Sequence, residues 1–281
     1  MKNEVRVLAR SELDAVLDWA ANEGWNPGLY DAGIFHATDP SGYFGVFVNG
    51  RLAGAVSAVA YDNDFGFIGC FIVLPEYRGG HLGPEVGRRA MEYLGVRNIG
   101  VDGVESKVAN YQAFGFKLAY HNIRFAGQIA GTDKSSLHSL VDAKQIPFDL
   151  LLAYDRRCFP AERKSFLSLW LGQPEAAALA MVEQKKLSGF GIIRKCRSGY
   201  KIGPLFADSA EIAEQLLTGL AAHIPSKDYF YLDVPDANPA ALRLVEKHGM
   251  KAVFRTARMY NRECPAIALN NIFGITTFEL G

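Results

Sequence analysis

The stretch "VLPEYRGGHLGPEVG", residues 73–87, has the residue types of a phosphate-binding turn. An apolar segment ends at its proline, Arg78 can neutralise an anion, and three glycines fall within the five positions 79–83. Glycines let oxygen atoms approach the backbone, and a helix N-terminus offers unbonded N–H groups and the positive end of the helix dipole. Pro84 suits the first position of such a helix, since it has no N–H to leave unbonded. The sequence therefore predicts a strand, a glycine turn and a helix N-terminus that together hold phosphate.

The stretch matches neither of the two commonest phosphate-binding patterns. It lacks the GxxxxGK[ST] spacing of a P-loop and the GxGxxG spacing of a dinucleotide-binding turn. The turn alone therefore does not identify the ligand that carries the phosphate, and the rest of the chain must do so.

The elements around this turn follow a mixed α/β order. The Asn-Gly pair inside residues 43–60 predicts a hairpin, and Ser11 is a candidate cap for the first helix. The expected elements are strand 4–9, helix 12–23, a short helix 30–36, the hairpin 43–60, strand 65–74, a helix ending near 94, strand 99–101, helix 107–114 and strand 117–125.

Composition excludes several classes of protein. Lys plus Arg equals Asp plus Glu at 30 each, so charge gives no reason to expect nucleic acid or an anionic membrane as a partner. The longest apolar run, residues 65–75, is too short to cross a bilayer. The four cysteines have no metal-binding spacing and read as reduced thiols of a cytoplasmic protein without a bound metal.

The second half of the chain repeats landmarks of the first. "FIG" and "KIG" end at Gly69 and Gly203, and "FGF" and "HGM" centre on Gly115 and Gly249; 203 minus 69 and 249 minus 115 both equal 134. "GRLAG" and "KKLSG" repeat at an offset of 135, from 54 to 189. Such constancy predicts a duplicated fold. The second copy has no Arg-Gly-Gly turn, which indicates a fold without the site.

The turn and a downstream segment resemble the GNAT superfamily of acyl-CoA-dependent N-acyltransferases. The residues that match its pyrophosphate loop are Val73, Pro75, Tyr77, Arg78, Gly79 and Gly83. His81 departs from the pattern, because it stands where the first pattern glycine belongs, and its ring could point outward or donate to a phosphate. In "VDGVESKVANYQAFGF", Tyr111 precedes Gly115 by four residues, the spacing that the superfamily shows for a tyrosine near the CoA sulfur. Val245 stands at the corresponding place in the second half.

The wording of these segments, with "EGWNPGLYD" near the N-terminus, is similar to bacterial proteins that carry a second, degenerate GNAT-like domain. The resemblance implies an α/β (α+β) protein with two tandem GNAT-like folds, each a mixed, mostly antiparallel twisted sheet flanked by helices. The expected parts are a catalytic domain over 1–126, a small, polar linker over 127–136 and a degenerate domain over 137–281. A homodimer is possible.

The resemblance also implies a mechanism. Acetyl-CoA would pair with a free strand edge, and a backbone N–H near residues 72–74 would polarise the thioester. A neutral amine of a small molecule or amino acid would attack directly, and Tyr111 would protonate the departing thiolate. The residues expected to bind the acetyl-CoA donor are Phe71, Ile72, Val73, Leu74, Arg78, Gly79, Gly80, His81, Leu82, Gly83 and Asn110.

The acceptor side is less defined by the sequence. Trp25, Asn26 and Asp31 fall in the segment that borders the acceptor site in this superfamily. The general base stays open among Asp31, Glu23, Asp102 and His36. The apolar C-terminal segment 270–281 is expected to pack as a strand, and it could return to the acceptor cleft with Glu279. A non-catalytic acyl-CoA sensor or scaffold is the alternative function.

Overall fold

The computed structural model describes residues 3–128, 139–225 and 228–281. Its first half consists of β1 (Asn3–Val7), α1 (Arg10–Asn22), α2 (Asp31–Thr38), β2 (Tyr43–Val48), β3 (Arg51–Ala60), β4 (Phe65–Val73), α3 (Leu82–Leu94), β5 (Asn98–Val104), α4 (Val108–Ala113) and β6 (Lys117–Gly127). The predicted elements are all present, and Asn49 and Gly50 have positive φ in the turn between β2 and β3, as an Asn-Gly hairpin requires.

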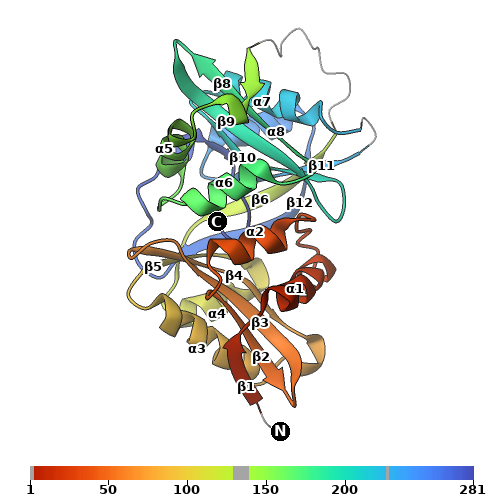
Figure 1. Ribbon diagram of the computed structural model, residues 1–281, viewed down its shortest axis with the longest axis vertical. Coiled ribbons are helices and arrows are strands. Elements are labelled where there is room, and N and C mark those ends of the chain that lie inside the picture. Colours follow the sequence, from red (N-terminus) through yellow and green to blue (C-terminus); the bar gives the residue numbers. More distant parts are fainter. Residues whose placement is uncertain (1–2, 129–138, 226–227) are drawn as a thin grey trace.

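The second half repeats this order of elements and adds one strand. It consists of β7 (Leu140–Asp142), α5 (Phe148–Cys158), α6 (Lys164–Gly172), β8 (Ala176–Glu183), β9 (Lys186–Lys195), β10 (Tyr200–Ala207), α7 (Ala210–Ala221), β11 (Phe230–Pro235), α8 (Pro239–Lys247), β12 (Lys251–Tyr260) and β13 (Ile272–Gly274). The two halves lie end to end (Figure 1), and the predicted duplication of the fold is confirmed.

All the described strands belong to one sheet, in which β6 of the first half pairs with the second half and β12 of the second half pairs with the first. The order is β1-β2-β3-β4-β5-β12-β6-β11-β10-β9-β8-β7, and β13 pairs with β10. β12 therefore lies antiparallel to β5 of the first half, and β6 lies antiparallel to β11 of the second. The predicted linker 127–136 begins at the end of β6, but residues 129–136 lie outside the described residues, so the domain boundaries stay a prediction.

Two local predictions about helix starts are wrong. Ser11 does not cap α1, because the helix begins at Arg10 and Ser11 is its second residue. The Glu12 carboxylate instead accepts from the N–H of Ala9 at 2.8 Å. Pro84 is the third residue of α3, not the first, because the helix begins at Leu82. Proline is tolerated there, since the N–H groups of the first turn have no partner within a helix.

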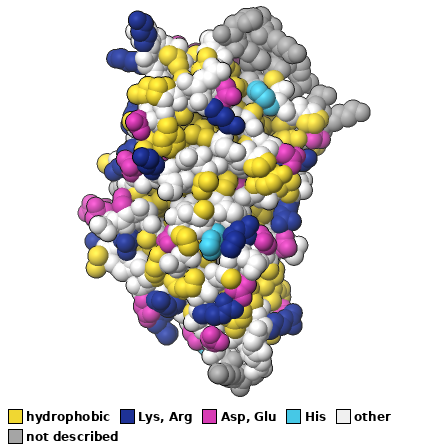
Figure 2. Space-filling view, viewed as in Figure 1, with side chains coloured by type: hydrophobic (Ala, Val, Ile, Leu, Met, Phe, Trp, Pro, Cys, Tyr) yellow, Lys and Arg dark blue, Asp and Glu magenta, His cyan; other side chains and the backbone are white. Residues whose placement is uncertain are grey.

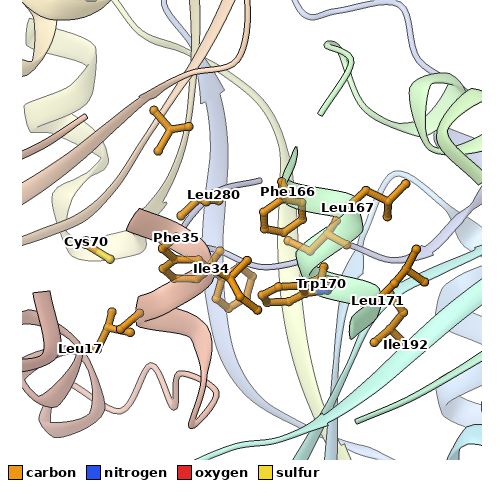
Figure 3. Close-up of a cluster of buried hydrophobic side chains, with 14 of the residues drawn as sticks. Leu17, Ile34, Phe35, Cys70, Phe166, Leu167, Trp170, Leu171, Ile192 and Leu280 are labelled. Carbon is orange, nitrogen blue, oxygen red and sulfur yellow. The ribbon is translucent and has the colours of Figure 1, made fainter. Parts of the chain in front are cut away.

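An apolar cluster joins the two halves. Phe35 on α2 stacks on Trp170 of α6 with ring centroids 6.2 Å apart, and Trp170 stacks in turn on Phe166. Figure 3 shows Phe35 and Ile34 pointing toward these α6 side chains, with Leu280 of the C-terminal segment beside them. The halves thus share a core as well as strands.

Buried ion pairs also cross between the halves. Arg194 on β9 forms two hydrogen bonds of 3.0 and 3.2 Å with Asp31 at the start of α2. Arg124 on β6 does the same with Asp233 on β11, at 2.6 and 2.8 Å. All four side chains are at most 2% exposed. Breaking such a pair leaves a buried charge uncompensated, so these contacts fix how the halves fit together.

The C-terminal segment runs back between the halves, where Figure 1 marks the C-terminus. β13 pairs with β10, and the next residue, Ile275, donates its N–H to the carbonyl of Asp233 at 2.9 Å. Farther along, the Tyr61 hydroxyl of the first half donates to the carbonyl of Leu280 at 2.8 Å. The expected strand in this segment is therefore short, and the rest of the segment is irregular chain that packs against both halves.

The surface mixes charges of both signs, as the face in Figure 2 shows. The four cysteines are free thiols, three of them buried. Among the described residues, no helix is long and apolar enough to cross a membrane.

Candidate active site

Strands β4 and β5 part halfway along their length. They pair in parallel from Phe65 and Asn98 as far as Ile68 and Val101, and beyond those residues both strands continue without pairing to each other. The expected splay is therefore present, and it leaves the edge of β4 from Gly69 onward facing a gap.

A bulge at Cys70 starts this free edge. Cys70 has a φ of +44°, and the register against β3 shifts there, since Ser57 lies opposite Gly69 whereas Ala55 lies opposite Ile72. A residue with positive φ bends the strand and turns the following backbone groups. No local sequence pattern predicts this bulge, because a cysteine rarely adopts a positive φ.

The backbone beyond the bulge alternates between β3 and the gap. The N–H of Leu74 donates to the carbonyl of Ala53 on β3 at 2.9 Å, so it cannot also serve a thioester oxygen. Ile72, two residues earlier, faces β3 in the same way, and Phe71 and Val73 therefore face the gap. Of the residues 72–74 that were expected to supply the oxyanion donor, only Val73 faces the gap, and Phe71 is a second available donor.

The glycine turn presents unbonded amides to the same region. Within the described residues, the N–H groups of residues 79–83 reach no acceptor, and the first helical bond of α3 runs from Glu85 to His81. Gly80 and Gly83 have ordinary φ, and a Cβ there would come no closer than 3.9 and 3.7 Å to a neighbouring atom. The fold itself therefore does not require glycine at these two positions, whereas a ligand that lies on the backbone would.

Arg78 and His81 flank this turn without covering it. The Arg78 guanidinium pairs with Glu23 and also donates from Nε to the carbonyl of Val73 at 2.8 Å. The His81 side chain is 75% exposed and contacts Asn3 of β1 at 2.7 Å. Of the two open readings for His81, the outward orientation is the one that the structure shows.

A cavity of about 50 Å³ occupies the gap between β4 and β5. Its walls from the first half include Trp25, Phe71, Asp102, Lys107 and Tyr111. The second half and the C-terminal segment contribute the opposite wall, which consists of Phe254, Thr256, Phe278 and Glu279. The residues from β12 could not be anticipated from sequence, because only the strand exchange brings them here.

Tyr111 lies on α4 at the edge of this cavity. Its ring covers Gly103 so closely that a Cβ at Gly103 would be 2.6 Å from the Tyr111 ring, and it meets Phe116 edge-on. Burial, together with the nearby Asp102 carboxylate, raises the pKa of Tyr111 to about 12. The hydroxyl is therefore a proton donor at neutral pH. The neighbouring residue Asn110 is exposed.

The predicted acceptor residues separate into one that lines the cavity and two that do not. Trp25 is in the wall, and its carbonyl accepts from Arg124 at 2.6 Å. Asn26 instead holds the backbone of Ser198 through two hydrogen bonds of 2.8 and 2.9 Å. Asp31 is fully buried in its pair with Arg194. Asn26 and Asp31 therefore join the halves in this structure and lie outside the cavity wall.

The candidate bases divide in a similar way. Glu23 pairs with Arg78, and His36 stacks beside Tyr43 at 6.3 Å; neither lines the cavity. Asp102 does line it, but both of its oxygens bond to Arg258 of β12, at 2.9 and 2.6 Å. Glu279 lines the cavity as well, which places the C-terminal segment in the expected cleft. Among the described residues, no group of His, Cys, Asp and Glu side chains is arranged to hold a metal ion.

The two parted strands, the glycine turn before a helix and the repeated element order define a tandem acyltransferase fold. Residues 10–116 match the model of the acetyltransferase (GNAT) family, and residues 151–274 match an acetyltransferase (GNAT) domain model. The two matches together cover most of the chain, which belongs to the GNAT acyltransferase family and carries two GNAT domains.

Known proteins with this arrangement span the whole chain. A holothin acyltransferase of Pseudoalteromonas is 25% identical over 96% of this chain and 92% of its own length. A protein of Pyrococcus horikoshii proposed to be an acetyltransferase has a structure with a TM-score of 0.83, at 22% identity over 99% of this chain and 96% of its own. A tandem GNAT protein from the clavulanic acid biosynthesis pathway has a TM-score of 0.63, at 15% identity over 94% of this chain and all of its own.

Proposed function

We propose that this protein transfers an acetyl group from acetyl-CoA to the amine of a small molecule. The observation that carries the proposal is the gap between β4 and β5, where a free strand edge and Tyr111 line one cavity. The unbonded amides of residues 79–83 follow the end of this strand. An extended chain with amide groups can pair with such an edge, and a diphosphate can accept from such amides. Acyl-CoA contains both groups, because its pantetheine arm carries the amides and its nucleotide end carries the diphosphate.

The residues of the first half take separate roles in this proposal. The N–H of Phe71 or Val73 stabilises the charge that develops on the thioester oxygen. Tyr111 gives its proton to the sulfur as the C–S bond breaks. Burial raises the pKa of the Cys70 thiol well above its usual value, with a further contribution from Glu279, so Cys70 stays protonated. A thiol is a far weaker nucleophile than a thiolate, which favours direct attack by the amine over an acyl-cysteine intermediate.

The walls of the cavity favour a small acceptor with an apolar part. Trp25, Phe71, Phe254 and Phe278 present aromatic surface, whereas an extended groove that could take a protein tail is not part of this cavity. Holothin is a suitable member of an acceptor panel, because a holothin acyltransferase is a relative over nearly the full chain.

The test measures the release of free CoA from acetyl-CoA with a panel of small amines that includes holothin. In Tyr111→Phe, we expect kcat to fall about 10- to 100-fold while acetyl-CoA affinity stays unchanged, because only proton donation is lost. Since the pKa of Tyr111 is raised to about 12, its hydroxyl stays protonated up to about pH 10, and the ratio of the two rates should be constant from pH 7 to pH 10.

Two results would contradict the proposal. A rate ratio near one over the whole range from pH 7 to pH 10 would show that the Tyr111 hydroxyl is not the proton donor. Tight binding of acetyl-CoA without CoA release on any amine would favour the alternative of an acyl-CoA sensor.

A further inference from the structure

Glu279 is a buried carboxylate with one oxygen unused. The residue is 1% exposed and lines the cavity between β4 and β5. Its Oε2 accepts from the hydroxyl of Thr277, whereas Oε1 reaches no hydrogen-bond partner in the described part of the chain. A buried acceptor without a partner costs about 1–3 kcal/mol, and more when it is charged, so its persistence calls for a ligand.

The main chain around Glu279 is fixed from both sides. Its carbonyl packs on Gly69 so closely that a Cβ at Gly69 would be 2.0 Å from that oxygen. The next residue, Leu280, accepts from the Tyr61 hydroxyl at 2.8 Å, and Arg163 donates to the carbonyl of Gly281 at 3.1 Å. These contacts hold Glu279 beside the bulge at Cys70, where the free edge of β4 begins.

Three buried cationic side chains, those of Arg124, Arg194 and Lys201, lie near Glu279. Besides the Arg124–Asp233 and Arg194–Asp31 pairs, the buried Lys201 lies close enough to interact with Glu279. Burial, with Arg124 nearby, lowers the pKa of Lys201, and the Glu279 carboxylate opposes that shift. Lys201 donates only to the Trp25 carbonyl, at 3.4 Å, and forms no ion pair among the described residues. Glu279 and Asp233 therefore interact with its charge without being hydrogen-bonded to it.

We propose that Glu279 binds the attacking amino group of the acceptor and takes its proton, so that the C-terminal segment supplies a catalytic residue to the site of the first half. The aromatic side chains of Trp25, Phe254 and Phe278 beside it hold the apolar part of the acceptor. The acceptor class is therefore a primary amine next to a flat or apolar group. This inference rests on the acyl-transfer function proposed above.

The proton and electron balance is as follows. The amine lone pair forms the bond to the acyl carbon, and the C–S bonding electrons leave with the sulfur. The Glu279 carboxylate takes one proton from the bound ammonium, which frees that lone pair, and the sulfur takes a proton from the Tyr111 hydroxyl. The nitrogen loses its second proton as the amide forms, and this proton returns through solvent to the Tyr111 oxygen. Glu279 releases its proton to solvent, so the products are an amide, free CoA and one proton.

The experiment compares two probes of the same shape, benzylamine and benzyl alcohol, on the full chain saturated with CoA. Titration calorimetry measures the Kd of each probe for the wild type, for Glu279→Gln and for Glu279→Asp. Glu263→Gln is the control, because Glu263 is exposed and lies outside the cavity wall. Thermal unfolding of each variant shows that it is folded at the temperature of the titration.

We expect benzylamine to bind Glu279→Gln about tenfold more weakly or worse, because a hydrogen bond between charged groups is lost, while benzyl alcohol binds both proteins alike. Glu279→Asp should recover part of the affinity, and Glu263→Gln should match the wild type. Equal benzylamine affinity in wild type and Glu279→Gln, or no benzylamine binding at all, would overturn the inference. A failure of the acyl-transfer proposal is distinct, because it appears as the absence of CoA release with any amine, whatever the probe affinities.

Discussion

In both halves of this protein two parallel strands separate partway along their length, but among the described residues another strand pairs at the gap only in the second half. In the first half, β4 and β5 separate after Ile68 and Val101, and the edge of β4 faces a cavity. In the second half, β10 and β11 pair only as far as Ile202 and Leu232, and beyond that point β13 pairs antiparallel with β10. The chain's own strand therefore occupies the place in the second half that an acyl-CoA arm is proposed to take in the first.

The helices that follow the parted strands show the same contrast. At the start of α7, the Ser209 hydroxyl accepts from the N–H of Ile212 at 3.3 Å, which satisfies part of the helix N-terminus. At the start of α3, the corresponding residue is His81, whose side chain makes no capping bond within the described residues. The second half satisfies part of its helix N-terminus with its own side chain, whereas the N–H groups at the start of α3 have no partner among the described residues.

The second half contributes residues to the cavity of the first half. The C-terminal segment that fills the gap of the second half continues into the first and places Phe278 and Glu279 in the wall of its cavity. The second half also lends β12 with Phe254 and Thr256. The second half, whose own gap is filled by β13, thus forms part of the cavity wall of the first.

The largest expected effect comes from breaking the link between the halves. Replacing Arg124 by Met leaves Asp233 buried and unpaired, which should lower the free energy of unfolding by about 3–5 kcal/mol. Because the halves exchange strands, we expect one cooperative transition in both the variant and the wild type, measured by urea unfolding. The exposed pair between Arg10 and Asp14 is the control, and Arg10→Met should cost about 0.5 kcal/mol or less. Two separate transitions would show that the halves fold independently.

The next effect concerns Gly69, a glycine that the packing of the fold requires, in contrast to Gly80 and Gly83. At Gly69 a Cβ would meet the Glu279 carbonyl at 2.0 Å, so Gly69→Ala must displace the C-terminal segment. We expect a loss of about 1–3 kcal/mol in stability and a higher KM for the acceptor, while acetyl-CoA affinity changes little. Thermal unfolding, calorimetry and acceptor kinetics measure these three quantities. Unchanged stability would mean that the segment does not rest on Gly69.

Much of the fold followed from local patterns in the sequence. The Asn-Gly hairpin, the helix after the glycine turn and the near-constant offset of about 134 residues each depend on residues close together in the chain or on direct comparison of two segments. The strand exchange could not be predicted, because β5–β12 and β6–β11 pairing depends on contacts more than a hundred residues apart that leave no local mark.

The candidate site was predictable on one side and only in part on the other. The glycine turn and Tyr111 carry local motifs, whereas Phe254 and Thr256 reach the cavity only through the exchanged strand. The place of Glu279 could be predicted, because an apolar C-terminal segment is expected to pack against the rest of the protein. Asp31 was misleading, since its partner, Arg194, lies on β9 of the other half, far away in the sequence. No local pattern marks two residues so far apart in the chain as a buried pair.

A smaller effect tests whether the glycine turn serves a ligand. Gly83 lies in the first turn of α3 with ordinary φ, and a Cβ there makes only an ordinary contact of 3.7 Å with Val73. Gly83→Ala should therefore leave the protein as stable as before, or up to about 1 kcal/mol more stable, because alanine favours the helix. Acetyl-CoA affinity should nevertheless fall about tenfold by calorimetry, with one site per chain before and after. Binding of two molecules per chain would contradict the assignment of the second half as filled.

The smallest effect concerns His81, where the chain departs from the pattern of its family. The imidazole points to Asn3 and is 75% exposed, so it neither blocks the amides of residues 79–83 nor supports them. In His81→Gly, acetyl-CoA affinity should therefore change less than about threefold, which is below 1 kcal/mol. Stability should change by only a few tenths of a kcal/mol, as glycine is an acceptable residue before a helix. A tenfold gain in affinity would show that the imidazole obstructs the turn, and a tenfold loss would show that it binds the diphosphate directly. Either result would show that the His81 side chain acts on the N-terminus of α3, which would then no longer be free in the way that distinguishes it from the capped N-terminus of α7.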